Sequence, residues 1–232
     1  GMTVVNEPIK NWYEEYYKIS GIGVVPNIPV NPYYKKKFSK QNLFRKEFKI
    51  PNEDLIFIYQ GLLSKFRGLD ILIKIFSSIS KSKHLVIMGY GEMEDEIIKV
   101  SSSQSNIHFK PAVKSDEIID YSSSADVGLN INFEEMTLSY TYCLPNKLYE
   151  YSIGRLYLIV TSNYIEQSRI INEQKLGTSV KPTFLDLKNL INNISLDEIK
   201  QTVENSEKFR SNISWLNNED VLFDVYKEKL KL

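Results

Sequence analysis

Apolar residues follow two alternating patterns along the chain. Short, nearly continuous apolar runs rich in β-branched residues predict strands buried on both faces. These runs cover residues 55–59, 85–88, 107–109, 127–130, 158–160 and 178–180. Segments with apolar residues at helical spacing lie between them and predict helices over 69–79, 92–100, 115–121, 145–153 and 164–172. This alternation predicts an α/β fold with a Rossmann-like, three-layer parallel sheet.

The two ends of the chain depart from this alternation. Residues 7–19 predict a helix, residues 21–25 a short strand, and the proline- and asparagine-rich residues 27–32 a linker. Beyond residue 185 the pattern is helical. Its last part, 221–232, is amphipathic and predicts either a terminal helix or a strap that docks elsewhere.

One predicted helix has a clearly assigned inner face. Within 92–100, we expect Ile97, Ile98 and Val100 to point toward the core. The charged residues of this helix are then left on the solvent side.

The overall charge excludes a general attraction to polyanions. The 29 lysines and arginines balance the 29 aspartates and glutamates, so the formal net charge is zero. No overall field favours nucleic acid or an anionic membrane. Lys35, Lys36 and Lys37 are expected to form a solvated surface stretch. Any anion site therefore has to be local, and we expect no nucleic-acid partner.

Nothing in the sequence predicts export or membrane insertion. The start lacks the charged segment and apolar stretch of a signal peptide. No apolar run approaches the roughly 18 residues that cross a bilayer. The single cysteine, Cys143, excludes an intramolecular disulfide and fits a reducing compartment. We therefore expect a soluble, cytoplasmic protein.

Cys143 is expected to be a small, half-buried residue. A nucleophilic role would require a histidine partner. The two histidines, His84 and His108, lie far away in sequence, near the starts of predicted strands.

The loop after the first predicted strand of the sheet is a candidate anion site. In parallel sheets, ligands bind at the carboxyl ends of the strands. Here the strand ends at Gly61, Lys65 and Arg67 follow, and Gly68 precedes a helix. Arg67 can form two hydrogen bonds to phosphate oxygens, Lys65 supplies a point charge, and the helix start favours an anion. A phosphate-binding loop is favoured over a loop with solvated cations.

A second glycine-rich strand end contains Gly89. The motif Gly89-Tyr90-Gly91 follows a strand, but the third glycine of a dinucleotide fingerprint would fall at Glu94. We therefore expect neither NAD nor FAD. The glycines still permit a ligand to approach the backbone closely.

The third candidate is the start of the helix that follows Pro145. Pro145 and Asn146 are typical helix-start residues, and the free amides around Asn146, Lys147 and Leu148 would face an anion. Glu150 lies about one turn further along and can accept two hydrogen bonds from a vicinal diol such as ribose. On spacing alone, an acidic residue that only complements the helix dipole is the simpler explanation.

An aromatic-rich loop precedes this helix. Its residues Phe133, Tyr140 and Tyr142 could stack on a base or a sugar, or pack in the core. Glu134 and Glu135 form an acidic pair beside them. No clear ligand spacing indicates a metal, and none is expected.

Taken together, these segments resemble the C-terminal, nucleotide-sugar-binding domain of GT-B-fold glycosyltransferases of family 4, the glycogen-synthase-like retaining enzymes. Four segments occur in the family's order: the strand, loop and helix 60–73, the strand end 85–91, the strand 124–129 and the helix start 145–155. The last of these is the most specific match.

The resemblance implies retaining transfer of a sugar from a nucleotide-sugar, expected to be a UDP-sugar, to a cell-envelope polysaccharide or lipid-linked glycan, without a metal. It also implies roles for individual residues. Lys65, Arg67 and Glu150 are the implied catalytic residues, the first two at the diphosphate and Glu150 at the ribose. The implied nucleotide-binding residues are Gly61, Gly89, Val113 beside the base, Pro145, Asn146, Lys147, Leu148 and Glu150.

The resemblance further implies a division of the chain. Residues 1–26 would be a remnant of the N-terminal acceptor domain and its crossover, 27–210 the donor-binding domain, and 211–232 a strap helix. The acceptor domain, or a partner chain that supplies it, would lie outside this sequence. The chain alone would be inactive, and the full enzyme is a candidate for peripheral membrane association.

The sequence departs from the family pattern at three places, one of which is Arg155-Leu156 where the family has Lys-Pro. Leu62 stands where the family has an arginine, so one phosphate cation is missing. Tyr142 stands where the family has a second glutamate, which leaves Glu134 or Glu135 to position the donor sugar.

Two other functions stay open. A non-catalytic Rossmann-like interaction or regulatory module would show no change in ligand binding when Glu150 or Arg67 is replaced. A sugar-nucleotide epimerase would need acid–base residues from both domains.

Overall fold

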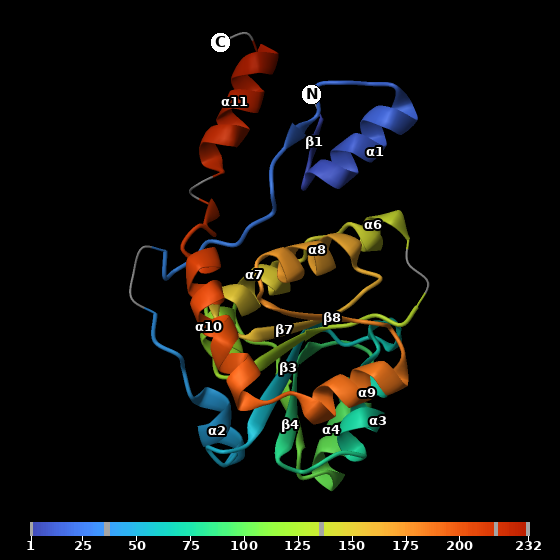
Figure 1. Cartoon of the computed structure of the whole chain (residues 1–232), viewed down its shortest axis with the longest axis vertical. Helices are drawn as coiled ribbons and strands as arrows, with labels where there is room; N and C mark the ends of the chain where they lie inside the picture. Colours follow the sequence, from blue (N-terminus) through green and yellow to red (C-terminus); the bar gives the residue numbers. More distant parts are fainter. Residues whose placement is uncertain (1, 35–37, 135–136, 216–217, 231–232) are drawn as a thin grey trace.

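The computed structural model describes residues 2–34, 38–134, 137–215 and 218–230. The predictions for Lys35, Lys36, Lys37 and Glu135 lie outside these ranges. Strands and helices alternate through the middle of the chain, as predicted (Figure 1). The strands of the main sheet are β3 (Leu55–Leu62), β4 (Lys83–Tyr90), β5 (Ile107–Pro111), β6 (Val127–Asn130), β7 (Tyr157–Thr161) and β8 (Gly177–Val180).

All six strands run parallel in the order β5-β4-β3-β6-β7-β8. The chain winds outward from β3 to β5 on one side, then returns to begin β6 on the other side of β3. The strand order therefore reverses between β3 and β6. Such a switch point opens a crevice at the carboxyl ends of the strands. The predicted α/β, Rossmann-like parallel sheet is confirmed.

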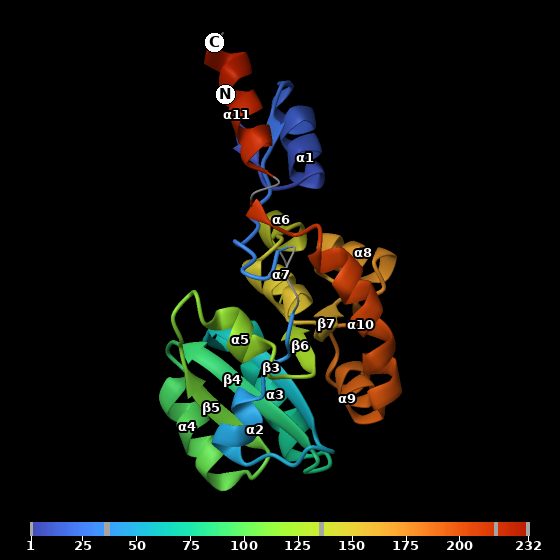
Figure 2. The same cartoon turned by 90° about the vertical axis from the view of Figure 1, so that its left-hand side faces the viewer.

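Helices cover both faces of the sheet and make three layers (Figures 1 and 2). Those covering the two faces are α2 (Leu43–Phe48), α3 (Leu69–Ser77), α4 (Glu94–Ser103), α5 (Ile118–Ser122), α7 (Asn146–Ile153), α8 (Ile165–Glu173) and α9 (Phe184–Asn193). The short α6 (Leu138–Thr141) precedes α7, and α10 (Leu196–Arg210) packs against α7.

The alternation of side chains along β3 explains how both layers attach. Phe57 and Tyr59 belong to the apolar cluster beneath α3, α4 and α9, whereas Ile56 and Ile58 belong to the cluster beneath α2, α7 and α8. Successive side chains of a strand point to opposite faces. An unbroken apolar run is thus what a strand buried on both faces requires.

The N-terminal segment forms a small unit of its own. The strands β1 (Thr3–Val4) and β2 (Gly23–Val24) pair in parallel, and helix α1 (Glu7–Tyr17) connects them. The side chain of Asn6 caps α1 by accepting a hydrogen bond from the Ile9 amide at 3.0 Å.

The last helix, α11 (Glu219–Leu230), leaves the main body and lies beside the N-terminal unit (Figures 1 and 2). A Cβ atom added at Gly23 would come within 2.7 Å of the Val225 side chain, which shows how closely α11 packs on β2. The C-terminal stretch is therefore a docked strap. The proposed division at residues 26 and 210 stays a prediction.

Two local predictions were wrong. Ile98 is 41% exposed, while Ile97 is buried. Adjacent helix positions differ by about 100°, and α4 turns Ile97 toward the core and Ile98 toward solvent. Helix α5 begins at Ile118 rather than at residue 115, since the preceding turn is closed by Glu117 accepting from the Lys114 amide at 3.3 Å.

None of the helices in the described ranges is both long and apolar enough to cross a membrane.

Candidate functional site

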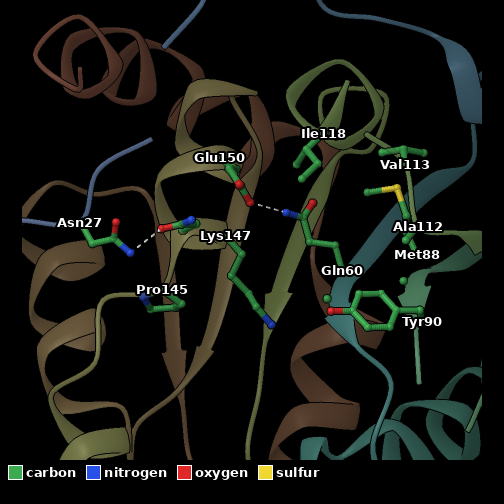
Figure 3. A pocket seen from close by; sticks show the side chains of 13 residues that line it. Asn27, Gln60, Met88, Tyr90, Ala112, Val113, Ile118, Pro145, Lys147 and Glu150 are labelled. Carbon is green, nitrogen blue, oxygen red and sulfur yellow. Dashed lines mark hydrogen bonds between the residues drawn. The ribbon is translucent and has the colours of Figure 1, made fainter. Parts of the chain in front are cut away.

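A cavity of ≈ 420 Å³ opens at the switch point of the sheet (Figure 3). It is bounded by the ends of β3 and β4, the segment after β5, the start of α5 and the first turns of α7. Seven of the predicted nucleotide-binding residues line it: Gly61, Gly89, Val113, Pro145, Asn146, Lys147 and Glu150. Residues from four separate predicted segments thus meet at one place.

The two strand-end glycines let β3 and β4 stay paired up to the edge of the cavity. Gly61 and Gly89 are partners in the parallel register. A Cβ atom at Gly89 would lie 1.9 Å from the Gly61 carbonyl oxygen, so no side chain fits there. The cavity floor is therefore bare backbone, which a ligand can approach closely.

Glu150 projects from α7 into the cavity and is held by Gln60 at the end of β3 (Figure 3). The Gln60 amide nitrogen donates a hydrogen bond to Glu150 Oε2. Glu150 is only 8% exposed. Burial raises the pKa of its carboxyl to about 7, although Lys147 and the Gln60 hydrogen bond act in the opposite direction. The group therefore titrates near neutrality.

Lys147 supplies a positive charge beside the β3 end. Its ammonium lies 4.5 Å from the centre of the Tyr59 ring, and a Cβ atom on Gly61 would be 4.0 Å from it. Loss of solvation, followed by the nearby positive charge of Arg67, lowers the pKa of Lys147 to about 8. The two cations are thus close enough to repel one another.

Arg67 faces a second cavity. Its guanidinium lies 5.4 Å from the centre of the Tyr140 ring. Within the described residues, neither Arg67 nor Lys147 forms an ion pair with a carboxylate. Two neighbouring cations held on aromatic rings without acidic partners favour a bound anion of high charge.

The start of α7 adds amide donors to this positive region. Pro145 occupies the N-cap position without a side-chain cap. The Leu148 amide already donates to the Pro145 carbonyl oxygen at 3.0 Å, and its side chain is buried in the core. In the part of the chain that the structure describes, the Asn146 and Lys147 amides have no backbone acceptor. These two amides, rather than all three that were predicted, stay available to an anion.

The second cavity measures ≈ 840 Å³ and lies beside the loop after β3. Arg67, Ser64, Glu134, Thr137 and Tyr140 are among its lining residues. Carboxylate, hydroxyl and aromatic groups of this kind suit a sugar. The predicted phosphate ligand Lys65 is exposed and lines neither of the two cavities; its role stays a prediction.

The aromatic loop is divided between different surroundings. Tyr140 lines the second cavity, whereas Phe133 packs against the core beside Gly68. Tyr142 lies next to α1, in a hollow with Trp12. Only one of the three aromatic residues therefore faces the candidate site.

The histidines do not activate the cysteine. His84 Nδ1 lies 3.0 Å from His108 Nε2, and His84 Nε2 lies 3.0 Å from Asp54 Oδ2, all near the amino ends of β4 and β5. Cys143 instead accepts a hydrogen bond from Gln167 at 3.4 Å. Burial raises the pKa of the Cys143 thiol, which opposes a nucleophilic role.

Sequence reasoning assigned no role to Gln60 or Asn27, yet both line the first cavity. Gln60 carried a usable signal, since it is a polar residue at the end of an apolar strand. Asn27 carried none. It lies in the predicted linker, and only the folded chain brings its amide within 3.2 Å of Asn146 Oδ1.

No group of three or more metal-ligating side chains that could hold a metal ion occurs among the described residues.

Comparison with known proteins identifies related sequences and folds. The family model described as "Glucosyltransferase 3-like, C-terminal domain" matches residues 73–215, more than half of the chain. No curated protein sequence matches.

Several solved structures share the fold. HepE of Anabaena, solved with UDP-glucose, is 13% identical, with a TM-score of 0.74 over 100% of this chain and 64% of HepE. A glycosyltransferase from Rickettsia africae is 18% identical, with a TM-score of 0.74 over 99% of this chain and 63% of that protein. WaaG, a glycosyltransferase involved in lipopolysaccharide biosynthesis, is 14% identical, with a TM-score of 0.70 over 96% and 61%. The chain thus spans about three-fifths of these proteins.

Proposed function

The chain belongs to the family of glucosyltransferase 3-like C-terminal domains, and on this premise we propose that it binds the nucleotide-sugar donor, a UDP-sugar, of a retaining glycosyltransferase. The observation that carries this proposal is the grouping of one carboxylate, two unpaired cations and two free helix amides around one strand end. A nucleoside diphosphate presents the complementary groups in the same order: a diol, then two phosphates.

The donor is placed across both cavities. In the first cavity, the ribose hydroxyls donate to Glu150, and the base lies against Val113 and Ile118. The diphosphate lies between Lys147, Arg67 and the amides at the start of α7. The transferred sugar enters the second cavity, where Glu134 takes the place of the missing family glutamate. The complex of HepE with UDP-glucose supports this class of donor.

The cations act on the leaving group. When the bond from the sugar to the diphosphate breaks, the electron pair stays on the β-phosphate and adds negative charge there. Lys147 and Arg67 stabilise this charge as it develops, which is the usual way in which fixed charges lower a barrier. The new bond joins the same sugar carbon to an acceptor oxygen, whose proton leaves to solvent or to the departing phosphate.

The acceptor is bound outside the described domain. We propose a cell-envelope polysaccharide or a lipid-linked glycan, supported by the role of WaaG in lipopolysaccharide biosynthesis. An acceptor domain or partner chain completes the cleft, and the whole enzyme works at the cytoplasmic surface of a membrane without a metal. The small β1-α1-β2 unit and α11 are the proposed point of attachment.

Calorimetric titration with UDP, GDP and ADP at low salt tests donor binding. We expect one diphosphate to bind, and Glu150→Ala and Arg67→Ala each to weaken binding by more than about 1 kcal/mol, the scale of a charge-assisted hydrogen bond. Lys74→Ala is the matched control, because Lys74 is an exposed lysine on α3 that faces Asp70. Equal binding by all variants would support a module that does not use this site.

A further inference from the structure

Gln60 is the one polar side chain of β3 that is buried at the cavity. Its side chain is 6% exposed, and both of its polar ends contact another residue. Nε2 donates to Glu150 Oε2, and Oε1 accepts from the Ser122 hydroxyl. The backbone amide of Gln60 donates to the Tyr151 hydroxyl at 3.1 Å. The residue is therefore fixed from three sides.

The hydroxyl of Ser122 contacts the amide group of Gln60. Ser122 Oγ is within hydrogen-bonding distance of Gln60 Oε1 and lies 2.7 Å from the Ile118 carbonyl oxygen. When the hydroxyl gives its one proton to Gln60, the amide NH₂ group has to point toward Glu150. A carboxylate accepts that bond best in its ionised form.

One oxygen of Glu150 is thereby occupied, and the other is left open. In the part of the chain that the structure describes, Glu150 Oε1 has no hydrogen-bond partner, and the residue lines the cavity. A diol that enters the cavity meets an oxygen whose position is already set. This pre-arrangement reduces the ordering that binding has to impose.

We propose that Gln60 is a positioning residue that aims Glu150 Oε1 at the ribose of the nucleotide, an assignment that rests on the proposed donor site. Gln60 touches Glu150 rather than the ligand's reacting atoms. It acts by holding the carboxyl group in one orientation and by favouring its ionised form.

The groups that face Glu150 allow the effect of the Gln60 hydrogen bond to be separated from effects of charge. Among the described residues, Lys147 on the same helix is the cation whose charge lowers the pKa of Glu150, and the Tyr151 phenol is next to Glu150. Gln60 on β3 and Ser122 on α5 are uncharged, so replacing Gln60 alters no charge. Gln60→Met removes the donated hydrogen bond and keeps a similar shape.

The direct test is the titration of the Glu150 carboxyl by ¹³C NMR in the ligand-free chain. Its signal is assigned by its loss in Glu150→Gln. We expect Gln60→Met to raise the Glu150 midpoint by about one pH unit, the equivalent of one charge-assisted hydrogen bond. An unchanged midpoint would overturn the proposal.

UDP binding provides the second readout. If only the ionised carboxyl binds ribose, the raised Glu150 midpoint makes the ratio of wild-type to Gln60→Met affinity roughly sevenfold larger at pH 6.5 than near pH 9. The ratio that remains near pH 9 measures the lost orientation of the carboxyl group, and a ratio that does not change with pH would contradict the proposed effect of Gln60 on ionisation. In the Glu150→Gln background, Gln60→Met should leave the pH dependence of binding unchanged.

The two readouts separate this inference from the proposed function. A raised Glu150 midpoint without any UDP binding supports the action of Gln60 and rejects the donor site. If Gln60→Met does not fold, Gln60→Glu keeps the shape and creates two carboxyls that share one proton. The upper apparent midpoint of that pair should then rise, and a failure to rise would overturn the inference.

Discussion

Replacing Glu150 with glutamine should stabilise the protein at neutral and higher pH while weakening the site. The glutamine has the shape of the protonated glutamate and can still accept a hydrogen bond from Gln60. It removes only the ability to ionise in a buried position. The variant thus isolates the energetic cost of keeping a carboxylate in the cavity wall.

The expected size follows from the Glu150 pKa, which burial raises from 4.5 to about 7. Between these values the folded state keeps a proton that the unfolded state releases, so stability falls as pH rises. The stabilisation from protonated Glu150 is complete below pH 4.5 and is lost as pH rises through 7. Over pH 4.5 to 8 the wild type should lose about 3 kcal/mol relative to Glu150→Gln.

Urea unfolding followed by circular dichroism at pH 4.5 and pH 8 measures this difference. Glu96→Gln is the control, because it makes the same chemical change at an exposed carboxylate on α4, outside the cavity. At pH 8, Glu150→Gln should melt roughly 6 to 12 °C above the wild type. An equal difference between the two proteins at both pH values would refute the reasoning. Glu150→Gln should also bind UDP more weakly, because the carboxylate that costs stability when it is buried is the group proposed to bind the ribose.

Three further outcomes are expected. Lys147→Met should weaken UDP binding, measured by calorimetry, about tenfold but leave uridine binding nearly unchanged, since uridine has no phosphate to pair with a cation. For the same reason, wild-type UDP binding should decline above pH 8, where Lys147 loses its proton. Glu134→Gln should lower the affinity for a UDP-sugar but not for UDP, and equal losses for both ligands would remove Glu134 from the sugar site. His108→Gln should remove part of the loss of stability in acid. Burial lowers the pKa of His108 to about 4, so the unfolded state binds more protons than the folded state as pH falls below 6.5. Urea unfolding of both proteins at pH 7 and 4.5 measures the effect.

The sequence predicted the succession of strands and helices along the chain, because each element has its own local pattern of apolar residues. The apolar run of β3 is buried on both faces, Gly61 and Gly89 lie near the ends of β3 and β4, and Gly68 precedes α3. The same patterns placed the start of α7 at Pro145 and Asn146. The short helices α2 and α6 were not predicted, since neither segment shows a clear helical period over its few residues.

The candidate site was predictable in parts. Motifs at Gly61, Gly89 and Glu150 were each found from local sequence, and the family resemblance gave them related roles and added Val113. Their convergence on one cavity could not be derived from any single segment. The resemblance also could not supply Gln60, because its partner Glu150 lies 90 positions away in the sequence.

The sequence by itself determined the α/β class, the succession of elements and the fact that any anion site has to be local, since these depend on neighbouring residues and net charge. The tertiary structure decided which strands pair, and so where the order reverses between β3 and β6. It also decided that Arg67 and Lys147 approach without acidic partners and that Glu150 is buried enough to titrate near neutrality. Burial and charge proximity arise from contacts between distant segments, and such contacts exist only in the folded chain.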